Sequence, residues 1–321
     1  MFYLQGMREN NFKMAEKCFQ EALITDELCP ASIKKYRSSL RTFFANIGPK
    51  NFPELNNGDF DQFIMAMKQN GAGNARIANV IATLKWIIAR LERKGIVFPH
   101  LDLLSIRKPK VMKSETNYLT EREVEQFLSG VAYHIAKRPT VKNVRFMTLA
   151  VFLLQTGARI GEALSIDIAD IDRPNKEVRI IGKGSKPRTL FLRQETFYWI
   201  DRYLALRHDG QPALFASQDG TARWKQTDVG RSFRRYKEKS GIKKDFVIHT
   251  FRHTFATQYL MKGAGINVVQ TALGHSDAVT TLKYYAAAVE KAKVREMIND
   301  RHFDFMPQSA SIRLGYEARQ C

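Results

Sequence analysis

The stretch LLQTGARIGEAL at residues 153–164 marks the place where the chain changes from helical to alternating hydrophobic spacing. Residues 144–155 are mostly apolar, which predicts a helix buried in a core. Arg159 opens a second predicted helix. Beyond it, residues 177–181 and 189–192 alternate between apolar and polar side chains, as two short strands do. The sequence therefore predicts helices around a small antiparallel β-sheet, a mainly α fold of the α+β class.

The two predicted strands enclose a turn rich in glycine and lysine, GKGSKP at residues 182–187, which predicts a hairpin with a basic tip. Thr120 followed by Glu123 is a capping-box signature, so a helix is expected to begin near Glu121. Further helices are predicted in this half of the chain at residues 195–206, 228–239, 250–261, 267–273 and 286–298.

The first hundred residues have helical periodicity. Helices are predicted at residues 12–24, 30–48, 59–71 and 74–95, and Gly95 is placed as a C-terminal stop for the last of them. The second of these helices carries a basic outer face, although most such faces are simply solvated surfaces. The basic residues of this face are Lys34, Lys35, Arg37 and Arg41.

A segment without periodicity separates the two halves. Residues 106–119 are basic and contain a proline, which is typical of a linker. We therefore predict a helical domain at residues 1–105, a mixed domain at residues 120–300 and a tail at residues 301–321. The first six residues, MFYLQG, are expected to be an appended segment ahead of a native start at Met7.

The charge balance favours a polyanionic partner. The chain has 51 Lys and Arg against 32 Asp and Glu, a formal net charge of +19, and basic side chains release counterions from phosphate backbones. A basic protein at a membrane surface would also fit, but the longest apolar run, from Phe146 to Gln155, is too short to cross a bilayer. No signal peptide is evident. Three cysteines without a C-x-x-C pair suit a reducing cytoplasm.

Four separated segments hold residue types suited to phosphoryl transfer. Taken singly each signal is weak, because lysines in turns and paired tyrosines are usually structural. Their occurrence together, in this order, points to a chemical site. The segments are the opening stretch with Arg159, the hairpin tip with Lys183, IHTFRHTFATQYL at 248–260 with His249 and Arg252, and LGHSDAVTTLKYY at 273–285 with His275, Tyr284 and Tyr285.

A phosphodiester reaction without a metal needs cationic donors around the non-bridging oxygens, a nucleophile, and a proton donor for the leaving oxygen. Guanidinium groups bond phosphate bidentately and stay charged at neutral pH. A tyrosine can attack phosphorus and hold the phosphate covalently, while a lysine can protonate the departing hydroxyl. Preorganised positive charge supplies much of the rate in such transfers.

Over residues 118–299 the four segments resemble those of the tyrosine recombinases, the family of phage integrases, Xer recombinases and Cre-like enzymes. The resemblance rests on TGARxxE, on strand–GKGSKPR–strand, on H-x-x-R, and on LGH followed nine residues after its histidine by a tyrosine. It implies a fold of the DNA breaking-rejoining type, with an N-terminal core-binding domain and a C-terminal catalytic domain. The N-terminal half has no comparable motif, but a C-shaped clamp around duplex DNA would need it.

The resemblance also implies how the phosphate is held. Arg159 and Arg252 would bind the scissile phosphate, and Glu162 would support the site from within its helix. Lys183 would be the general acid on the 5′ oxygen, although Lys186 lies three residues away on the same hairpin.

The remaining implied roles concern the nucleophile. His249 would act as a base or hydrogen-bond partner, and His275 would complete the site. Tyr284 would be the nucleophile. The adjacent Tyr285 is chemically competent, and only the spacing from His275 selects Tyr284.

The implied reaction is cleavage to a 3′-phosphotyrosyl intermediate with a free 5′ hydroxyl. That hydroxyl, or a 5′ hydroxyl from a partner duplex, then attacks the intermediate and reseals the strand. Because the phosphotyrosyl bond conserves the energy of the ester, no metal, ATP or other cofactor is required. The expected partners are double-stranded DNA with specific recombination sites and accessory DNA-bending proteins. The chain itself is expected to form a homotetramer on two such sites, with the tail exchanged between protomers. Further DNA contacts are expected from Lys34, Lys35, Arg37, Arg41, Arg76, Lys85, Lys186 and Arg188.

Three alternatives stay open. His249 and His253 at positions i and i+4 could ligate zinc, although the glutamate of an H-E-x-x-H helix is missing and Arg252 would lie beside the metal. A type IB topoisomerase would use similar chemistry to relax supercoils as a monomer. A catalytically silent DNA-binding regulator would not need all six site residues. Within the family, the chain fits a Xer-type resolvase or a compact mobile-element integrase.

Overall fold

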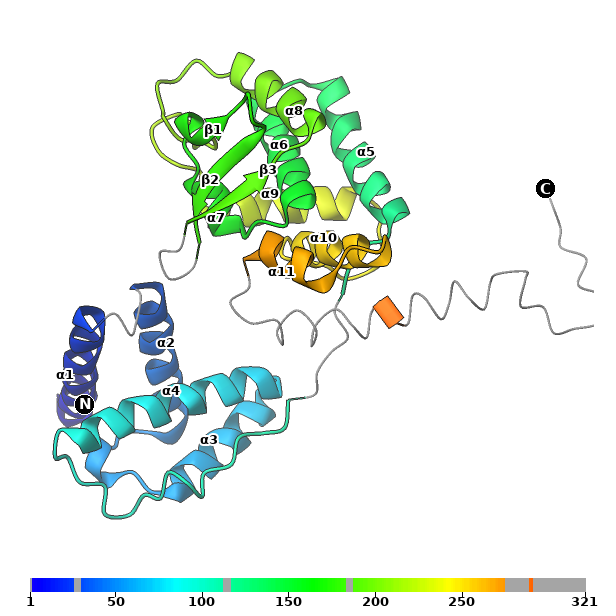
Figure 1. Cartoon of the computed structure of the whole chain (residues 1–321). Coiled ribbons are helices and arrows are strands. Elements are labelled where there is room, and N and C mark those ends of the chain that lie inside the picture. The colour runs from blue at the N-terminus through cyan, green and yellow to red at the C-terminus, as the bar shows by residue number, and fades with distance from the viewer. Residues whose placement is uncertain (1, 26–29, 112–116, 183–186, 275–288, 291–321) are drawn as a thin grey trace, which may run out of the picture. The chain divides into compact units, whose positions relative to one another are not determined.

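The computed structural model describes residues 2–25, 30–111, 117–182, 187–274 and 289–290. The chain forms two compact units, Met1–Lys113 and Ser114–Cys321, both drawn in Figure 1. The division falls within the segment predicted as a linker. Ile106 is buried in the core of the first unit and Leu119 in the core of the second, so the residues between them join two separate hydrophobic cores.

All the named secondary-structure elements among the described residues of the first unit are helical. Helix α4 contacts each of the other three α-helices and crosses them in Figure 1. The predicted helices are confirmed, and α1 begins ten residues earlier than the pattern indicated. The elements are α1 (Phe2–Ile24), α2 (Pro30–Ile47), the 3₁₀ turn η1 (Phe52–Glu54), α3 (Asn57–Gln69) and α4 (Asn74–Arg93).

Aromatic side chains form the centre of this unit. The Phe43 ring lies 4.9 Å from that of Phe60 and 5.1 Å from that of Phe63, measured between ring centroids. The buried Asn11 side chain of α1 accepts a hydrogen bond of 2.9 Å from the backbone N–H of Phe52. The loop after α2 is therefore fixed to α1, and the relative position of the helices follows from this core.

The second unit is built around α6 (Val141–Thr156). Helices α5 (Glu121–Lys137), α8 (Gln194–Ala205), α9 (Gln226–Lys239) and α10 (Thr250–Met261) all contact it, as Figure 1 shows. Because α6 is covered on several sides, most of its side chains are buried and apolar. Helix α5 begins at the predicted capping box, which the hydrogen bonds between Thr120 and Glu123 confirm.

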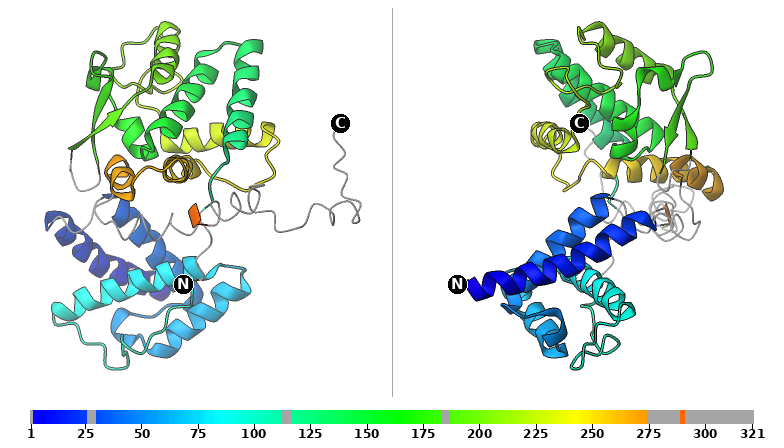
Figure 2. Two further views of the ribbon diagram at one scale, coloured as in Figure 1. Left: turned by 45° about the vertical axis from the view of Figure 1, so that its right-hand side comes forward. Right: turned by 90° about the vertical axis from the view of Figure 1, so that its left-hand side faces the viewer.

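A three-stranded antiparallel sheet lies on one side of the second unit (Figure 2). Its order is β1 (Ile171–Asp172), β2 (Glu177–Ile181), β3 (Pro187–Phe191). The facing pair Val178 and Leu190 is buried, and so anchors the hairpin to the core. The predicted hairpin is confirmed. Strand β1 was not predicted, because two residues are too few to show alternation.

Two short α-helices and one 3₁₀ turn complete the named elements of the second unit: α7 (Ile160–Ser165), η2 (Ile168–Asp170) and α11 (Ile266–Leu273). The observed architecture confirms the predicted mainly α fold with a small antiparallel sheet. The helix predicted at residues 286–298 lies outside the described residues except for 289–290, and so does the tail at residues 301–321. Among the residues described, none of the helices has the length and apolar character needed to cross a bilayer.

Gly157 is the point where α6 meets α10 and α11. It caps α6 in the left-handed conformation, with φ of 63°. A Cβ at this position would come within 2.5 Å of Phe255 Cδ1 and 2.9 Å of Leu273 Cδ2. Only glycine therefore suits both the backbone angle and the close approach of the two helices. The tight crossing brings the opening stretch of the site next to the helix that carries Arg252.

Candidate active site

Arg159 and Glu162 form a compact unit at the start of α7. Arg159 occupies the N-cap with extended backbone angles. Its backbone N–H donates to Glu162 Oε2 at 2.7 Å, and its Nη1 donates to Glu162 Oε1 at 2.8 Å. The Glu162 side chain is 7% exposed and that of Arg159 is 33% exposed. The buried carboxylate thus orients a guanidinium group that still reaches solvent.

Arg188 of β3 makes the second ion pair with Glu162. Its Nη2 lies 2.7 Å from Glu162 Oε2, and its Nη1 donates to the carbonyl oxygen of Ala272. The side chain is only 13% exposed. The sequence predicts Arg188 as a DNA contact. In the structure its side chain is largely buried and joins the hairpin to α7 and α11. One signal was available: Arg188 shares the inward face of its strand with Leu190.

Arg252 on α10 is the most deeply buried of the three arginines, with 3% of its surface exposed. Its Nη1 donates to the carbonyl of Gly157 and its Nη2 to that of Leu273, both at 2.7 Å. These bonds fix the guanidinium plane between the end of α6 and the end of α11. A cation at the C-terminus of a helix is also favoured by the helix dipole.

His249 lies at the N-cap of α10, one turn before Arg252. Partial desolvation of the ring lowers the pKa of His249, and the positive charges of Arg252 and Arg159 lower it further. The ring still reaches solvent, and it meets that of His253 edge to face at 4.9 Å. The lowered pKa favours the neutral imidazole, the form that can accept a proton.

Glu162 stays charged in spite of its burial. Burial alone would raise the pKa of Glu162, but hydrogen bonds from Arg159 and the charge of Arg188 outweigh this, and the net pKa lies below its ordinary value of 4.5. The cluster of Arg159, Arg188, Arg252 and Glu162 thus holds three positive charges and one negative charge, a surplus of two. A surplus of fixed positive charge at a partly open site has the chemistry of a phosphate-binding site.

The other predicted site residues lie outside the described residues. These are Lys183 and Lys186 of the hairpin tip, His275, and the pair Tyr284 and Tyr285. The structure thus brings together Arg159, Glu162, Arg252 and His249, and it describes the chain up to Gly274, the residue before His275.

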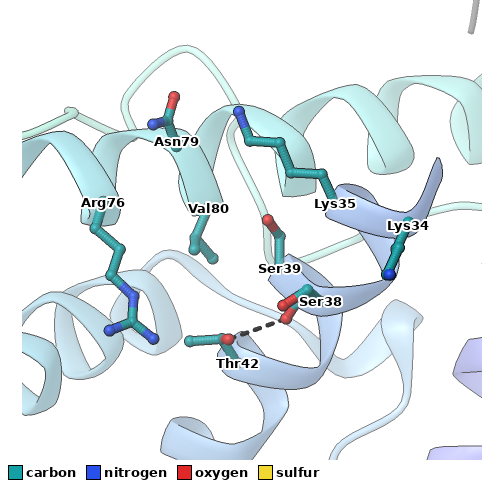
Figure 3. A pocket seen from close by; sticks show the side chains of 8 residues that line it. All are labelled: Lys34, Lys35, Ser38, Ser39, Thr42, Arg76, Asn79 and Val80. Atoms are coloured by element: carbon teal, nitrogen blue, oxygen red, sulfur yellow. Dashed lines mark hydrogen bonds between the residues drawn. The ribbon is translucent and has the colours of Figure 1, made fainter. Parts of the chain in front are cut away.

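A polar groove of about 580 Å³ lies between α2 and α4 in the first unit. Figure 3 shows Arg76 and Lys35 on opposite walls, with hydroxyl groups of α2 between them. Thr42 Oγ1 donates to the Ser38 carbonyl at 2.9 Å. The groove has no acidic lining residue. Its lining residues are Lys34, Lys35, Ser38, Ser39, Thr42, Arg76, Asn79 and Val80.

The other basic residues predicted to bind DNA in this unit have partners within the protein. Arg37 makes an ion pair with Glu16 of α1. The Arg41 guanidinium lies 5.7 Å from the centre of the Phe12 ring. Lys85 donates to the carbonyl of Ile106 at 2.9 Å, and burial lowers its pKa. The pattern could not show these contacts, because the partners lie on other segments.

Potential metal ligands do not gather within the described residues, where no group of three His, Cys, Asp or Glu is arranged to hold an ion. His249 and His253 lie close together, but a zinc site would need further ligands. The described part therefore offers no ligand set for the zinc alternative.

The sequence model of the phage integrase family matches residues 117–291, more than half of the chain. The chain therefore belongs to the phage integrase family, which confirms the resemblance to tyrosine recombinases. Two similar proteins are both named tyrosine recombinase XerD. The one from Oceanobacillus iheyensis is 28% identical over 78% of this chain and 83% of its own length. The one from Proteus mirabilis is 28% identical over 89% of this chain and 92% of its own length.

Several solved structures share the fold. The Tn1549 transposon integrase in complex with a circular intermediate DNA has a TM-score of 0.65 at 19% identity, over 88% of this chain and 99% of that chain. A lambda integrase tetramer bound to a Holliday junction has a TM-score of 0.68 at 14% identity, over 85% of this chain and 77% of that chain. At these identities the likeness supports the fold class alone.

The Glu162→Gln substitution tests the charge balance of the site, because it keeps the shape and removes the negative charge. We expect the free energy of unfolding at pH 7 to fall by about 2 kcal/mol, a value reduced to allow for the solvent exposure of Arg159. Since the pKa of Glu162 is lowered, the difference should persist above pH 4.5 and shrink as pH falls through the lowered pKa. Urea unfolding at several pH values measures it.

The matched control is Glu125→Gln, which changes an exposed glutamate of α5. This control should stay within about 0.5 kcal/mol of the wild type at every pH. A Glu162→Gln protein as stable as the wild type at pH 7 would contradict the proposed charge balance.

Proposed function

We propose that this chain, a site-specific tyrosine recombinase, cleaves and rejoins DNA with Tyr284 as the nucleophile. Arg159 and Arg252 bind the scissile phosphate, and Glu162 orients Arg159. Lys183 protonates the leaving oxygen. His275 completes the site beside the phosphate. The observation that carries the proposal is the described cluster, in which Glu162 pairs with Arg159 and the buried Arg252 is anchored on backbone carbonyls. His249 lies one turn before Arg252, and the charges of both arginines help to lower its pKa.

The chemistry follows from these groups. The Tyr284 oxygen attacks phosphorus and gives its proton to His249, whose lowered pKa keeps it neutral and able to accept. The bond between phosphorus and the 5′ oxygen breaks, and the electron pair leaves on that oxygen, which takes a proton from Lys183. A 5′ hydroxyl then attacks the phosphorus of the phosphotyrosyl ester and gives its proton to Lys183, while the released Tyr284 oxygen takes back the proton held by His249. The number of phosphoester bonds is unchanged, so no ATP is needed, and the arginines supply the positive charge that a metal ion would otherwise provide.

The proposed partner is double-stranded DNA that carries recombination sites. The net charge of +19 and the basic groove between α2 and α4 support binding to its phosphate backbone. We further propose a homotetramer on two sites, since the lambda integrase of similar fold is a tetramer on a Holliday junction. Exchange of the tail at residues 301–321 between protomers and accessory DNA-bending proteins belong to the same proposal. We also propose a cytoplasmic location, since the proposed substrate is cellular DNA.

The biological role we propose is resolution or integration by a compact two-domain enzyme. The similar proteins named XerD match over most of their length, which supports a Xer-type resolvase. A mobile-element integrase is the other candidate role, because the Tn1549 transposon integrase shows that the same fold serves such an enzyme. The domain limits proposed for either role are a core-binding domain at residues 1–105 and a catalytic domain at residues 120–300.

The Tyr284→Phe substitution tests the nucleophile. The binding site is first selected from random duplexes with Tyr284→Phe protein, and a nicked version is then incubated with each protein. Cleavage next to the nick releases a short fragment, so religation fails and the covalent adduct accumulates. Denaturing electrophoresis should show the adduct for the wild type and for the control Tyr285→Phe. The Tyr284→Phe protein should show none, because phenylalanine has no oxygen to attack phosphorus.

An adduct that survives Tyr284→Phe would overturn the assignment of the nucleophile. Loss of the adduct only in Tyr285→Phe would transfer the role to the neighbouring tyrosine.

The Arg76→Ala substitution tests the groove between α2 and α4. If Arg76 contacts one DNA phosphate, the slope of log affinity against log salt should become shallower by about 0.9. Fluorescence anisotropy between low and moderate salt measures it. The matched control is Arg37→Ala on α2, because Arg37 is paired with Glu16 and should leave the slope unchanged. Equal slopes for wild type and Arg76→Ala would exclude the groove as a phosphate contact.

A further inference from the structure

We propose that Arg188 is a positioning residue for strand cleavage, which fixes the end of α11 and the β2–β3 hairpin to the Glu162 carboxylate. The inference rests on the proposed roles of Arg159 and Tyr284. Arg188 would touch neither DNA nor nucleophile, and it would act by setting where the phosphate-binding arginines and the chain after α11 lie.

The contacts of Arg188 join three segments that are far apart in sequence. It reaches Glu162 of α7, 26 residues away, with Nη2 at 2.7 Å. It also reaches the carbonyl of Ala272, 84 residues away, with Nη1. A planar guanidinium can bond two such acceptors at once, whereas the single ammonium nitrogen of a lysine cannot span them in the same way.

Gly274 is shaped to accept this side chain. It closes α11 in the left-handed conformation, with φ of 63°. A Cβ here would lie 2.8 Å from Arg188 Cδ and 3.0 Å from its Nε. The arginine therefore lies directly against the backbone of the residue before His275. Any other residue at position 274 would displace the guanidinium or the chain.

Two arginines together hold the last turn of α11. Arg188 binds the carbonyl of Ala272 and Arg252 binds that of Leu273. Carbonyls at a helix C-terminus lack partners within the helix, and the helix dipole favours cations there. Because adjacent carbonyls are held by different elements, the direction in which the chain leaves α11 depends on both. A displacement of about 1 Å at a reacting group can slow a reaction about 100-fold.

The test measures single-turnover cleavage of the nicked site, with protein in excess and at saturating DNA. Arg188→Met should cleave about 100-fold more slowly than the wild type, and Arg188→Lys should lie between them because it keeps one ion pair. DNA affinity should stay unchanged for both. Far-UV circular dichroism checks that each protein is folded. If Arg188→Met is not folded, Arg188→Lys still allows the test. The matched control is Arg179→Met, which removes an exposed arginine from β2 of the same hairpin and should cleave like the wild type.

A double-mutant cycle separates positioning from general stabilisation. If Arg188 acts through Glu162, the Arg188→Met, Glu162→Gln protein should cleave no more slowly than the slower single variant. Effects that multiply would overturn the inference, and so would folded Arg188→Met and Arg188→Lys proteins that cleave within about twofold of the wild type. These results leave the proposed function intact. A wild-type protein that forms no adduct would instead overturn the proposed function, and this inference with it.

Discussion

The buried carboxylate of Glu162 is the group on which the described site depends. Arg159 and Arg188 approach it from different segments, and without it their like charges would repel each other in a poorly hydrated place. With it, one negative charge offsets part of their repulsion, and Arg252 adds a third positive charge that is anchored on backbone carbonyls. In the proposed function the surplus of positive charge stabilises the phosphate, since the reaction spreads negative charge over its oxygens.

Arg252 connects the end of α6, just before Arg159, to the end of α11, which precedes the segment with the proposed nucleophile. Arg252 is bonded to the end of α6 through Gly157 and to the end of α11 through Leu273. A residue from the third of the four segments thus fixes the first segment and the start of the fourth. These three segments therefore share one network of contacts among the described residues. Preorganisation of this kind removes the cost of rearranging charges during the reaction.

Much of the fold could be predicted, because amphipathic periods mark the helices of both units and alternation marks the hairpin. Arg159, Glu162, His249 and Arg252 could be found as well, because their motifs are local. The place of Arg188 could not, since its partners lie 26 and 84 residues away and a basic residue near a hairpin tip resembles a DNA contact. The local spacing of residues gives at most a weak signal of contacts between segments that are far apart in sequence.

The most direct measurement of the central claim is to locate the attached nucleotide on the protein. The covalent adduct formed on a nicked site can be digested with nuclease and protease, and the peptides sequenced by tandem mass spectrometry. We expect a nucleotide joined through its 3′ phosphate to the oxygen of Tyr284. A nucleotide on Tyr285, on a serine, or joined through a 5′ phosphate would contradict it.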